Sequence, residues 1–315
     1  MKKQLRGILI LLLTAVIWGT GFAAQDDGMK YFDPFTFNAL RMIPAAVALI
    51  PVAFFFEWRK SRGAKSAAVD SGEEENAVRR SRTRAELVGG IACGVLLSLA
   101  SATQQYGIFL TASPGKAGFI TSLYIILVPV IGICIRRVPQ WTVWPCALLG
   151  AFGLWLICGS SLSGFGAGEL FLLLCALLYS VQITAVDLSL GRGARPVTLS
   201  LVQFITASVV MTAFAFVAER PTIAGIAVGF ASGWLPVLYL GLVSSAVGYT
   251  LQIVGQRDCP PVAASMLMSL ESVFSVLAGW IFLRKTLSLV EIAGCLTVFV
   301  AVIISQIPVK QKKKA

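Results

Sequence analysis

Two ionisable side chains stand inside long apolar stretches of the sequence. Glu271 lies within the apolar segment 262–283, and Arg41 lies within 34–56. Charged groups are costly inside a bilayer, so those found there usually serve ligand binding, ion passage or proton transfer. The alternative is structural: an internal ion pair, a charge satisfied by backbone carbonyls or, for Arg41, a side chain that reaches the membrane interface.

Glu271 is our candidate for proton coupling. Taking a carboxylate out of water favours its neutral form, which lets such a group bind and release protons near neutral pH. An acid and a base that face one cavity would also suit a zwitterion such as an amino acid. We therefore expect both Glu271 and Arg41 to contact the substrate.

Polar and aromatic residues near the centres of other apolar segments extend this set. Rings with one polar group can line a cavity and bind an apolar solute. Ordinary packing, or placement at the membrane interface, is the alternative. The further candidates for substrate binding are Trp18, Gln105, Tyr124, Tyr179 and Gln252.

Several kinds of chemistry are disfavoured by the composition. Histidine, the commonest general base and metal ligand, is absent. The seven cysteines form no CxxC pair and fall in or beside apolar segments, which is typical of small buried hydrophobes. No GxxxxGK[ST] sequence occurs, which argues against ATP hydrolysis by this chain. We expect no catalytic residues, no metal site and no cofactor.

The elements that position these side chains are predicted to be membrane-spanning helices. The chain is 57% hydrophobic and 13% charged, whereas soluble domains carry about 25% charged residues. Apolar segments long enough to cross about 30 Å of hydrocarbon recur along its length. We predict an all-α polytopic membrane protein with ten spans: 6–25, 34–56, 87–111, 115–135, 141–159, 169–189, 197–217, 232–256, 262–283 and 287–306. Pro129 predicts a break in the fourth span, either as a hinge or as a static kink.

Residues 94–137 and 241–284 are two copies of one pattern. Ten of their 44 aligned positions are identical, where about three would match by chance in so apolar a chain. The identities include Gly94 with Gly241, Gln105 with Gln252, and Ser122-Leu123 with Ser269-Leu270. Because the second copy begins five spans after the first, the two copies cross the membrane in opposite directions, as in many secondary transporters. Tyr124 stands where the second copy has Glu271, and we expect this mismatch to mark the site.

The basic residues predict the orientation of the spans. With alternating spans, 20 of the 26 lysines and arginines fall on the side of the termini and five on the other, while Arg41 lies within a span. The excess predicts cytoplasmic termini and explains the net charge of +11 without a nucleic-acid partner. The first apolar run is longer than the core of a signal peptide, so we expect an uncleaved first span. For 57–86 we expect a solvated, flexible cytoplasmic linker, with a regulatory docking segment as the alternative.

The order of these features resembles the EamA-type family of the drug/metabolite transporter superfamily. The resemblance rests on the five-plus-five repeat, on Trp18-Gly19 in the first span, on Pro34 and Arg41 in the second, and on a glycine-rich last span in each half. The second half departs from it, because Tyr179-Ser180 replaces the Trp-Gly step and Gln203 stands in place of Arg41.

The resemblance implies a division into a first EamA-like repeat over 6–159, a second over 169–306 and a basic cytoplasmic tail over 307–315. It also implies that spans five and ten are peripheral and that the other eight surround a central cavity. Members of the family export or import small organic solutes.

We therefore expect a secondary transporter in the cytoplasmic membrane of a bacterium, which moves an amino acid, metabolite or drug-like compound by alternating access. Proton coupling through Glu271 is one option. The expected partners are a small-molecule substrate and the lipid bilayer but no nucleic acid, and a homodimer is left open. The alternatives are a channel, a non-transporting scaffold or sensor, and a membrane-embedded lipid-modifying enzyme. An enzyme would need clustered acids, histidines or cysteines at one depth, and the sequence shows no such cluster.

Overall fold

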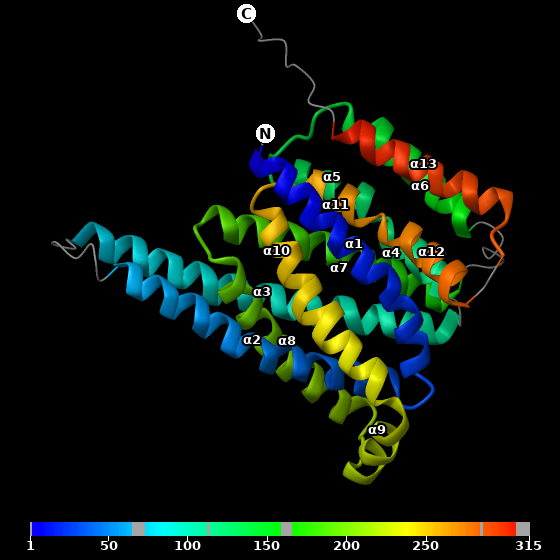
Figure 1. The fold of residues 1–315 in the computed structure, drawn as a ribbon, viewed down its shortest axis with the longest axis horizontal. Helices are drawn as coiled ribbons and strands as arrows, with labels where there is room; N and C mark the ends of the chain where they lie inside the picture. The colour runs from blue at the N-terminus through cyan, green and yellow to red at the C-terminus, as the bar shows by residue number, and fades with distance from the viewer. Residues whose placement is uncertain (1, 65–72, 112–113, 159–165, 284–285, 307–315) are drawn as a thin grey trace, which may run out of the picture.

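The computed structural model describes residues 2–64, 73–111, 114–158, 166–283 and 286–306 (Figure 1). These residues form helices joined by short turns, with no strand among them. The helices are α1 (Lys2–Gly28), α2 (Pro34–Ala64), α3 (Glu73–Thr111), α4 (Pro114–Ser122), α5 (Tyr124–Cys134), α6 (Val143–Cys158), α7 (Ala167–Gly191), α8 (Pro196–Ala218), α9 (Ile223–Leu238), the π-helix η2 (Tyr239–Tyr249), α10 (Thr250–Gln256), α11 (Pro261–Met268), α12 (Glu271–Leu283) and α13 (Leu289–Ser305).

The helices confirm the all-α polytopic architecture. Within the described part of the chain, eight helical stretches are long and apolar enough to cross a membrane, and two shorter apolar helices, α6 and α13, account for the fifth and tenth predicted spans. The eighth span is longer than predicted, because α9, η2 and α10 together run from residue 223 to 256.

The flexible linker expected for 57–86 is wrong for the residues that the structure describes there. α2 continues to Ala64 and α3 begins at Glu73, while 65–72 lie outside the described residues. The segment is rich in good helix formers. In addition, Arg195 at the start of α8 forms ion pairs with Glu57 of α2 and Glu86 of α3, which ties both extended helices to the second half of the chain.

Spans four and nine are each built from two helices with a break between them. Leu123 separates α4 from α5, and Ser269 and Leu270 separate α11 from α12. At each break the backbone tightens into a three-residue turn: the N–H of Leu123 donates to the carbonyl of Ile120 at 3.2 Å, and that of Leu270 donates to Leu267 at 3.3 Å. The two turns fall at matching positions of the inverted repeat.

Pro129 does not mark the break in span four. It lies inside α5, six residues beyond Leu123. A proline that cannot donate at one turn leaves the rest of a helix intact when neighbouring helices support it. The break that was expected at Pro129 therefore lies at Leu123.

Matching contacts join the two halves. A Cβ atom on Gly94 of α3 would lie 2.6 Å from the carbonyl oxygen of Gln203 on α8. In the same way, a Cβ atom on Gly241 of η2 would lie 2.8 Å from the carbonyl oxygen of Arg41 on α2. Gly94 matches Gly241 in the repeat, and Arg41 matches Gln203. The inverted repeat is therefore present in the helix packing as well as in the sequence.

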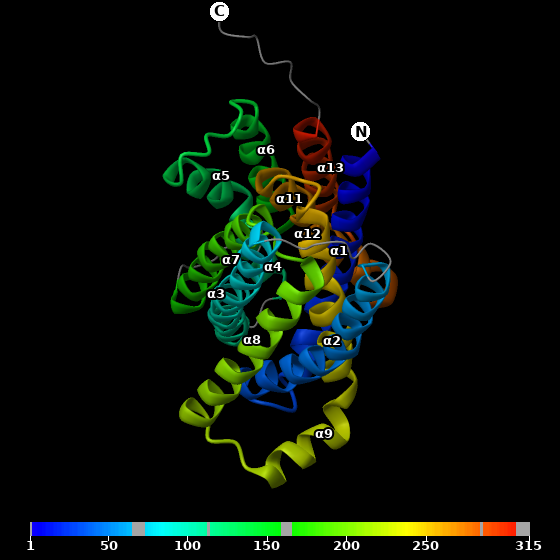
Figure 2. The ribbon, with the colours of Figure 1, turned by 90° about the vertical axis from the view of Figure 1, so that its left-hand side faces the viewer.

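α6 and α13 pack together at one edge of the molecule (Figures 1 and 2). Their crossing is close, because a Cβ atom on Gly153 would lie 2.9 Å from the carbonyl oxygen of Gly294, and one on Gly294 would lie 2.7 Å from that of Gly153. Small residues let helices approach in lipid, where apolar burial drives little association. This peripheral pair agrees with the position that the resemblance implies for spans five and ten.

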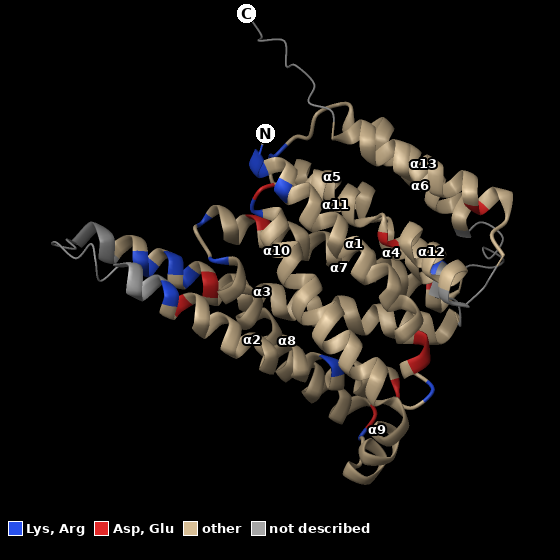
Figure 3. Ribbon diagram, viewed as in Figure 1, with Lys and Arg blue, Asp and Glu red and all other residues tan. Residues whose placement is uncertain are grey.

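Charged residues gather toward the two ends of the helix bundle (Figure 3). At the end that holds the N-terminus, Arg6 pairs with Asp258 at 2.5 Å. At the opposite end, Lys116 of α4 pairs with Glu169 of α7 at 2.7 Å, and these two side chains are only 10% and 9% exposed. Each pair joins the first half of the chain to the second, so ion pairs hold the halves together at both ends.

We expect Glu169→Gln to lower the thermal stability of the purified protein. The change leaves the ammonium of Lys116 without the carboxylate it now contacts, and breaking a buried pair from one side is strongly destabilising. It keeps an acceptor for the backbone N–H of Gly166, which Glu169 caps at 2.9 Å. The double variant Lys116→Met, Glu169→Gln should recover most of the loss, because it removes the buried ammonium and keeps the acceptor for the N–H of Gly166. Equal unfolding temperatures for the wild type and Glu169→Gln, measured by scanning fluorimetry, would contradict this account.

Candidate functional site

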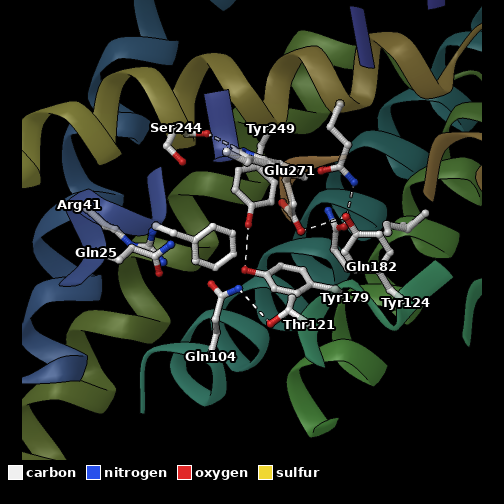
Figure 4. A pocket seen from close by; sticks show the side chains of 14 residues that line it. Gln25, Arg41, Gln104, Thr121, Tyr124, Tyr179, Gln182, Ser244, Tyr249 and Glu271 are labelled. Carbon is white, nitrogen blue, oxygen red and sulfur yellow. Dashed lines mark hydrogen bonds between the residues drawn. The ribbon is translucent and has the colours of Figure 1, made fainter. Parts of the chain in front are cut away.

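A cavity between the two halves contains most of the expected binding residues (Figure 4). It has about 510 Å³ of space not occupied by atoms, its open mouth included. Six of the seven candidates line it: Trp18, Arg41, Tyr124, Tyr179, Gln252 and Glu271.

Gln105 is the candidate that does not line the cavity. Its side chain is fully buried elsewhere, and neither of its amide atoms has a hydrogen-bond partner in the described part of the chain. The preceding residue, Gln104, does line the cavity and donates to the hydroxyl of Thr121 at 3.4 Å. One residue along a helix turns a side chain by about 100°. The repeat therefore points to the turn of α3 that contacts the cavity, but the structure places Gln104 there and not Gln105.

Glu271 contacts Tyr124, the residue that matches it in the first half. The hydroxyl of Tyr124 donates to Oε1 of Glu271 at 3.0 Å, and that of Ser122 lies 3.4 Å from the same oxygen. Ser122 also lies 2.8 Å from the hydroxyl of Ser272, so serines of both halves bond across the interface. Glu271 is the first residue of α12 and Tyr124 the first of α5. The two helix breaks thus bring the mismatched positions of the repeat together.

An aromatic wall lies beside the carboxylate. The hydroxyl of Tyr249 donates to that of Tyr179 at 2.9 Å, and Tyr179 lies 3.3 Å from the hydroxyl of Ser101. The ring of Trp18 packs 4.7 Å from the ring of Tyr249, and its Nε1 donates to the carbonyl of Ser244 at 3.1 Å. These rings offer flat apolar surface, while their polar atoms are held by the protein.

Arg41 is buried inside the protein and lines the cavity. The residue is 5% exposed, and its Nε donates to Oδ1 of Asn38 at 2.7 Å. Asn38 is itself fixed, since its Nδ2 donates to the carbonyl of Ser101 at 2.9 Å. Arg41 forms no ion pair with any carboxylate of the described residues, Glu271 included. The internal ion pair that was one structural alternative for these two residues is therefore not formed.

A chain of four glutamines extends from the cavity wall. Nε2 of Gln252 lies 3.1 Å from Oε1 of Gln182 and 3.0 Å from Oε1 of Gln256. Nε2 of Gln182 in turn donates to Oε1 of Gln203 at 3.0 Å. Gln203 matches Arg41 in the inverted repeat, yet it bonds to Gln182 and does not line the cavity. The matching positions therefore differ in both side chain and contacts: Arg41 lines the cavity, whereas Gln203 bonds to Gln182.

Several residues that line the cavity were not among the sequence candidates. They follow the candidates at helical spacing on the same helix face. Phe22 and Gln25 lie four and seven residues after Trp18, Gln182 lies three after Tyr179, and Tyr249 lies three before Gln252. A search along the face of each helix would have found them.

Comparison with known proteins shows which family the chain belongs to. The EamA-like transporter family matches two stretches, residues 5–159 and 166–306. An uncharacterized transporter from Archaeoglobus fulgidus is 26% identical over 304 residues, which cover 96% of this chain and 86% of that protein. A protein crystal structure with 18% identity superposes with a TM-score of 0.69, covering 95% of this chain and 96% of the other, a likeness of fold. The chain therefore belongs to the EamA-like transporter family, and it is a multi-pass membrane protein.

Proposed function

We propose that the protein is a secondary transporter that moves a small organic solute by alternating access between its two halves. The observation that carries this proposal is the placement of the cavity. Residues of both broken spans line it, and the first residues of α5 and α12 meet there across the interface of the halves. Helices interrupted at a substrate site are typical of transporters built from inverted repeats.

In this proposal Glu271 carries the coupled proton. It is the only acidic residue among those that line the cavity in the described part of the chain. Its Oε1 accepts from Tyr124, and a protonated carboxyl can donate as well as accept. Gain or loss of that proton changes which contacts join α5 to α12 at the break, and thus links protonation to the interface that has to move.

The remaining lining groups bind the solute. The aromatic wall of Trp18, Tyr179 and Tyr249 packs against its apolar body, and Gln252 and Arg41 contact its polar groups. We also propose that the protein lies in the cytoplasmic membrane of a bacterium with both termini in the cytoplasm. The excess of basic residues on the side of the termini supports this orientation.

A ligand screen followed by a flux assay tests the proposal. Purified protein is heated with amino acids, nucleosides and cationic drugs, and compounds that raise its unfolding temperature are taken forward, because a ligand that binds only the folded state stabilises it. We expect at least one of them to enter proteoliposomes with saturable kinetics, well above protein-free liposomes. If ligands bind and none crosses the membrane, the protein is a sensor and the proposal is wrong.

A further inference from the structure

We propose that Arg41 binds a carboxylate of the transported solute, so that the protein selects organic acids, amino acids among them, over their neutral or cationic analogues. This inference rests on the proposed function, because it assigns the substrate class of the same cavity. It also predicts the binding properties of the cavity whether or not flux follows.

The first argument is the missing partner of the guanidinium. Arg41 is 5% exposed and lines the cavity, and its only protein hydrogen bond in the described part of the chain is from Nε to Asn38. Nη1 and Nη2 therefore have no hydrogen-bond acceptor among the described residues. A buried charge is costly unless it is paired, and the cavity is the place from which a pairing anion can come.

The second argument is the geometry that Asn38 imposes. By accepting from Nε, Asn38 occupies the side edge of the guanidinium and leaves the end edge, with Nη1 and Nη2, available. Two parallel N–H groups match the two oxygens of a carboxylate. Asn38 is completely buried and bonded to the carbonyl of Ser101, so this orientation is fixed before the ligand binds.

The third argument is that no described side chain in the cavity takes the place of a ligand carboxylate at Arg41. Glu271 accepts from Tyr124 and forms no ion pair with Arg41. Gln25 lines the same cavity, yet its Oε1 is buried and accepts no hydrogen bond from the described residues, Arg41 included. In the view of Figure 4, Arg41 and Gln25 lie on one side and Glu271 on the other, with the Tyr179–Tyr249 pair between them.

The inverted repeat supplies the variant for the test. Gln203 stands at the matching position in the second half, so Arg41→Gln introduces a side chain that the same fold already accommodates there. Arg41→Lys keeps the positive charge but loses the two parallel N–H groups of the guanidinium. Arg192→Gln is the matched control, since Arg192 is exposed at the end of α7 and does not line the cavity.

The experiment measures unfolding temperatures of the purified proteins against a library of carboxylates, each paired with its own primary amide. We expect stabilisation by one or more carboxylates and not by the matching amides. Affinity should fall by about a hundredfold or more in Arg41→Gln, because truncating one partner of a buried charge pair is costly. Arg41→Lys should be weakened, and Arg192→Gln should bind as the wild type does. Ligand-free Arg41→Gln should be at least as stable as the wild type, since an unpaired cation has been removed.

Three results would overturn the inference: no carboxylate in the library binds, amides bind as well as their acids, or carboxylates bind Arg41→Gln with unchanged affinity. A marked loss of stability in ligand-free Arg41→Gln would also overturn it, because that is the result expected of a structural arginine. Flux in proteoliposomes separates this inference from the proposed function. Carboxylates that bind through Arg41 and never cross the membrane contradict transport alone, whereas Arg41-independent transport of amides contradicts the inference alone.

Discussion

Glu271→Gln should abolish solute accumulation driven by a pH gradient. If one proton moves with each solute, a gradient of one pH unit can sustain about tenfold accumulation, because a tenfold concentration ratio corresponds to about 1.4 kcal/mol. Glutamine has nearly the shape of glutamic acid and can still accept from Tyr124, but it binds no proton. The variant should therefore equilibrate solute without concentrating it.

The measurement is uptake into proteoliposomes with and without an imposed pH gradient. Glu291→Gln is the control, because Glu291 caps α13 outside the cavity through Ser288, and a glutamine keeps that capping box. Expression and unfolding temperature of Glu271→Gln should match the wild type, since no ion pair is broken. Unchanged dependence on the gradient would remove Glu271 from the role of proton carrier.

Gly19→Ala should both destabilise the protein and impair this coupling. A Cβ atom on Gly19 would lie 2.6 Å from Cβ of Phe274 and 2.7 Å from the carbonyl oxygen of Glu271. Because that oxygen belongs to the backbone of Glu271, α1 and α12 have to separate at this residue. Overpacking of this kind typically costs about 1 to 3 kcal/mol. We expect a lower unfolding temperature and weaker gradient-driven uptake.

Gly21→Ala is the matched control on the same helix. A Cβ atom there would lie 3.4 Å from Cδ2 of Leu240 and 3.5 Å from the hydroxyl of Ser244, which is ordinary contact or close to it. Alanine also favours a helix over glycine. Gly21→Ala should therefore be as stable and active as the wild type. If both variants behave alike, close packing at Gly19 is not what positions Glu271.

The fold was predictable from the sequence because two strong signals agree. Long apolar segments predict the membrane spans. The second copy of the repeat begins an odd number of spans after the first, which predicts the inversion. The errors arose where local packing competes with these signals. The segment 57–86 is charged, yet Glu57 and Glu86 find a common partner in Arg195, so the helices continue. Pro129 is the residue type that usually breaks a helix, but the break lies at Leu123.

The position of the candidate site could be predicted from the sequence, but its geometry only in part. The mismatch of Tyr124 and Glu271 indicates the place where the halves meet, because matching positions near a pseudo-twofold axis come into contact. The choice of Gln105 over Gln104 depends on helix rotation, which the identity with Gln252 does not fix. The hydrogen bond of Arg41 to Asn38, and the absence of an acceptor for Nη1 and Nη2 among the described residues, depend on side-chain directions that only the structure shows.

Counterflow tests the central claim, alternating access, most directly. Proteoliposomes are loaded with unlabelled solute, identified by the ligand screen, and diluted into a trace of labelled solute with no ion gradient. A carrier that exposes its site to one side at a time exchanges the two, so labelled solute should transiently accumulate above its outside concentration. The overshoot should also survive in Glu271→Gln, because the exchange of one solute molecule for another requires no net proton movement. Labelled solute that only equilibrates, with a rate proportional to concentration, would contradict alternating access and indicate a channel.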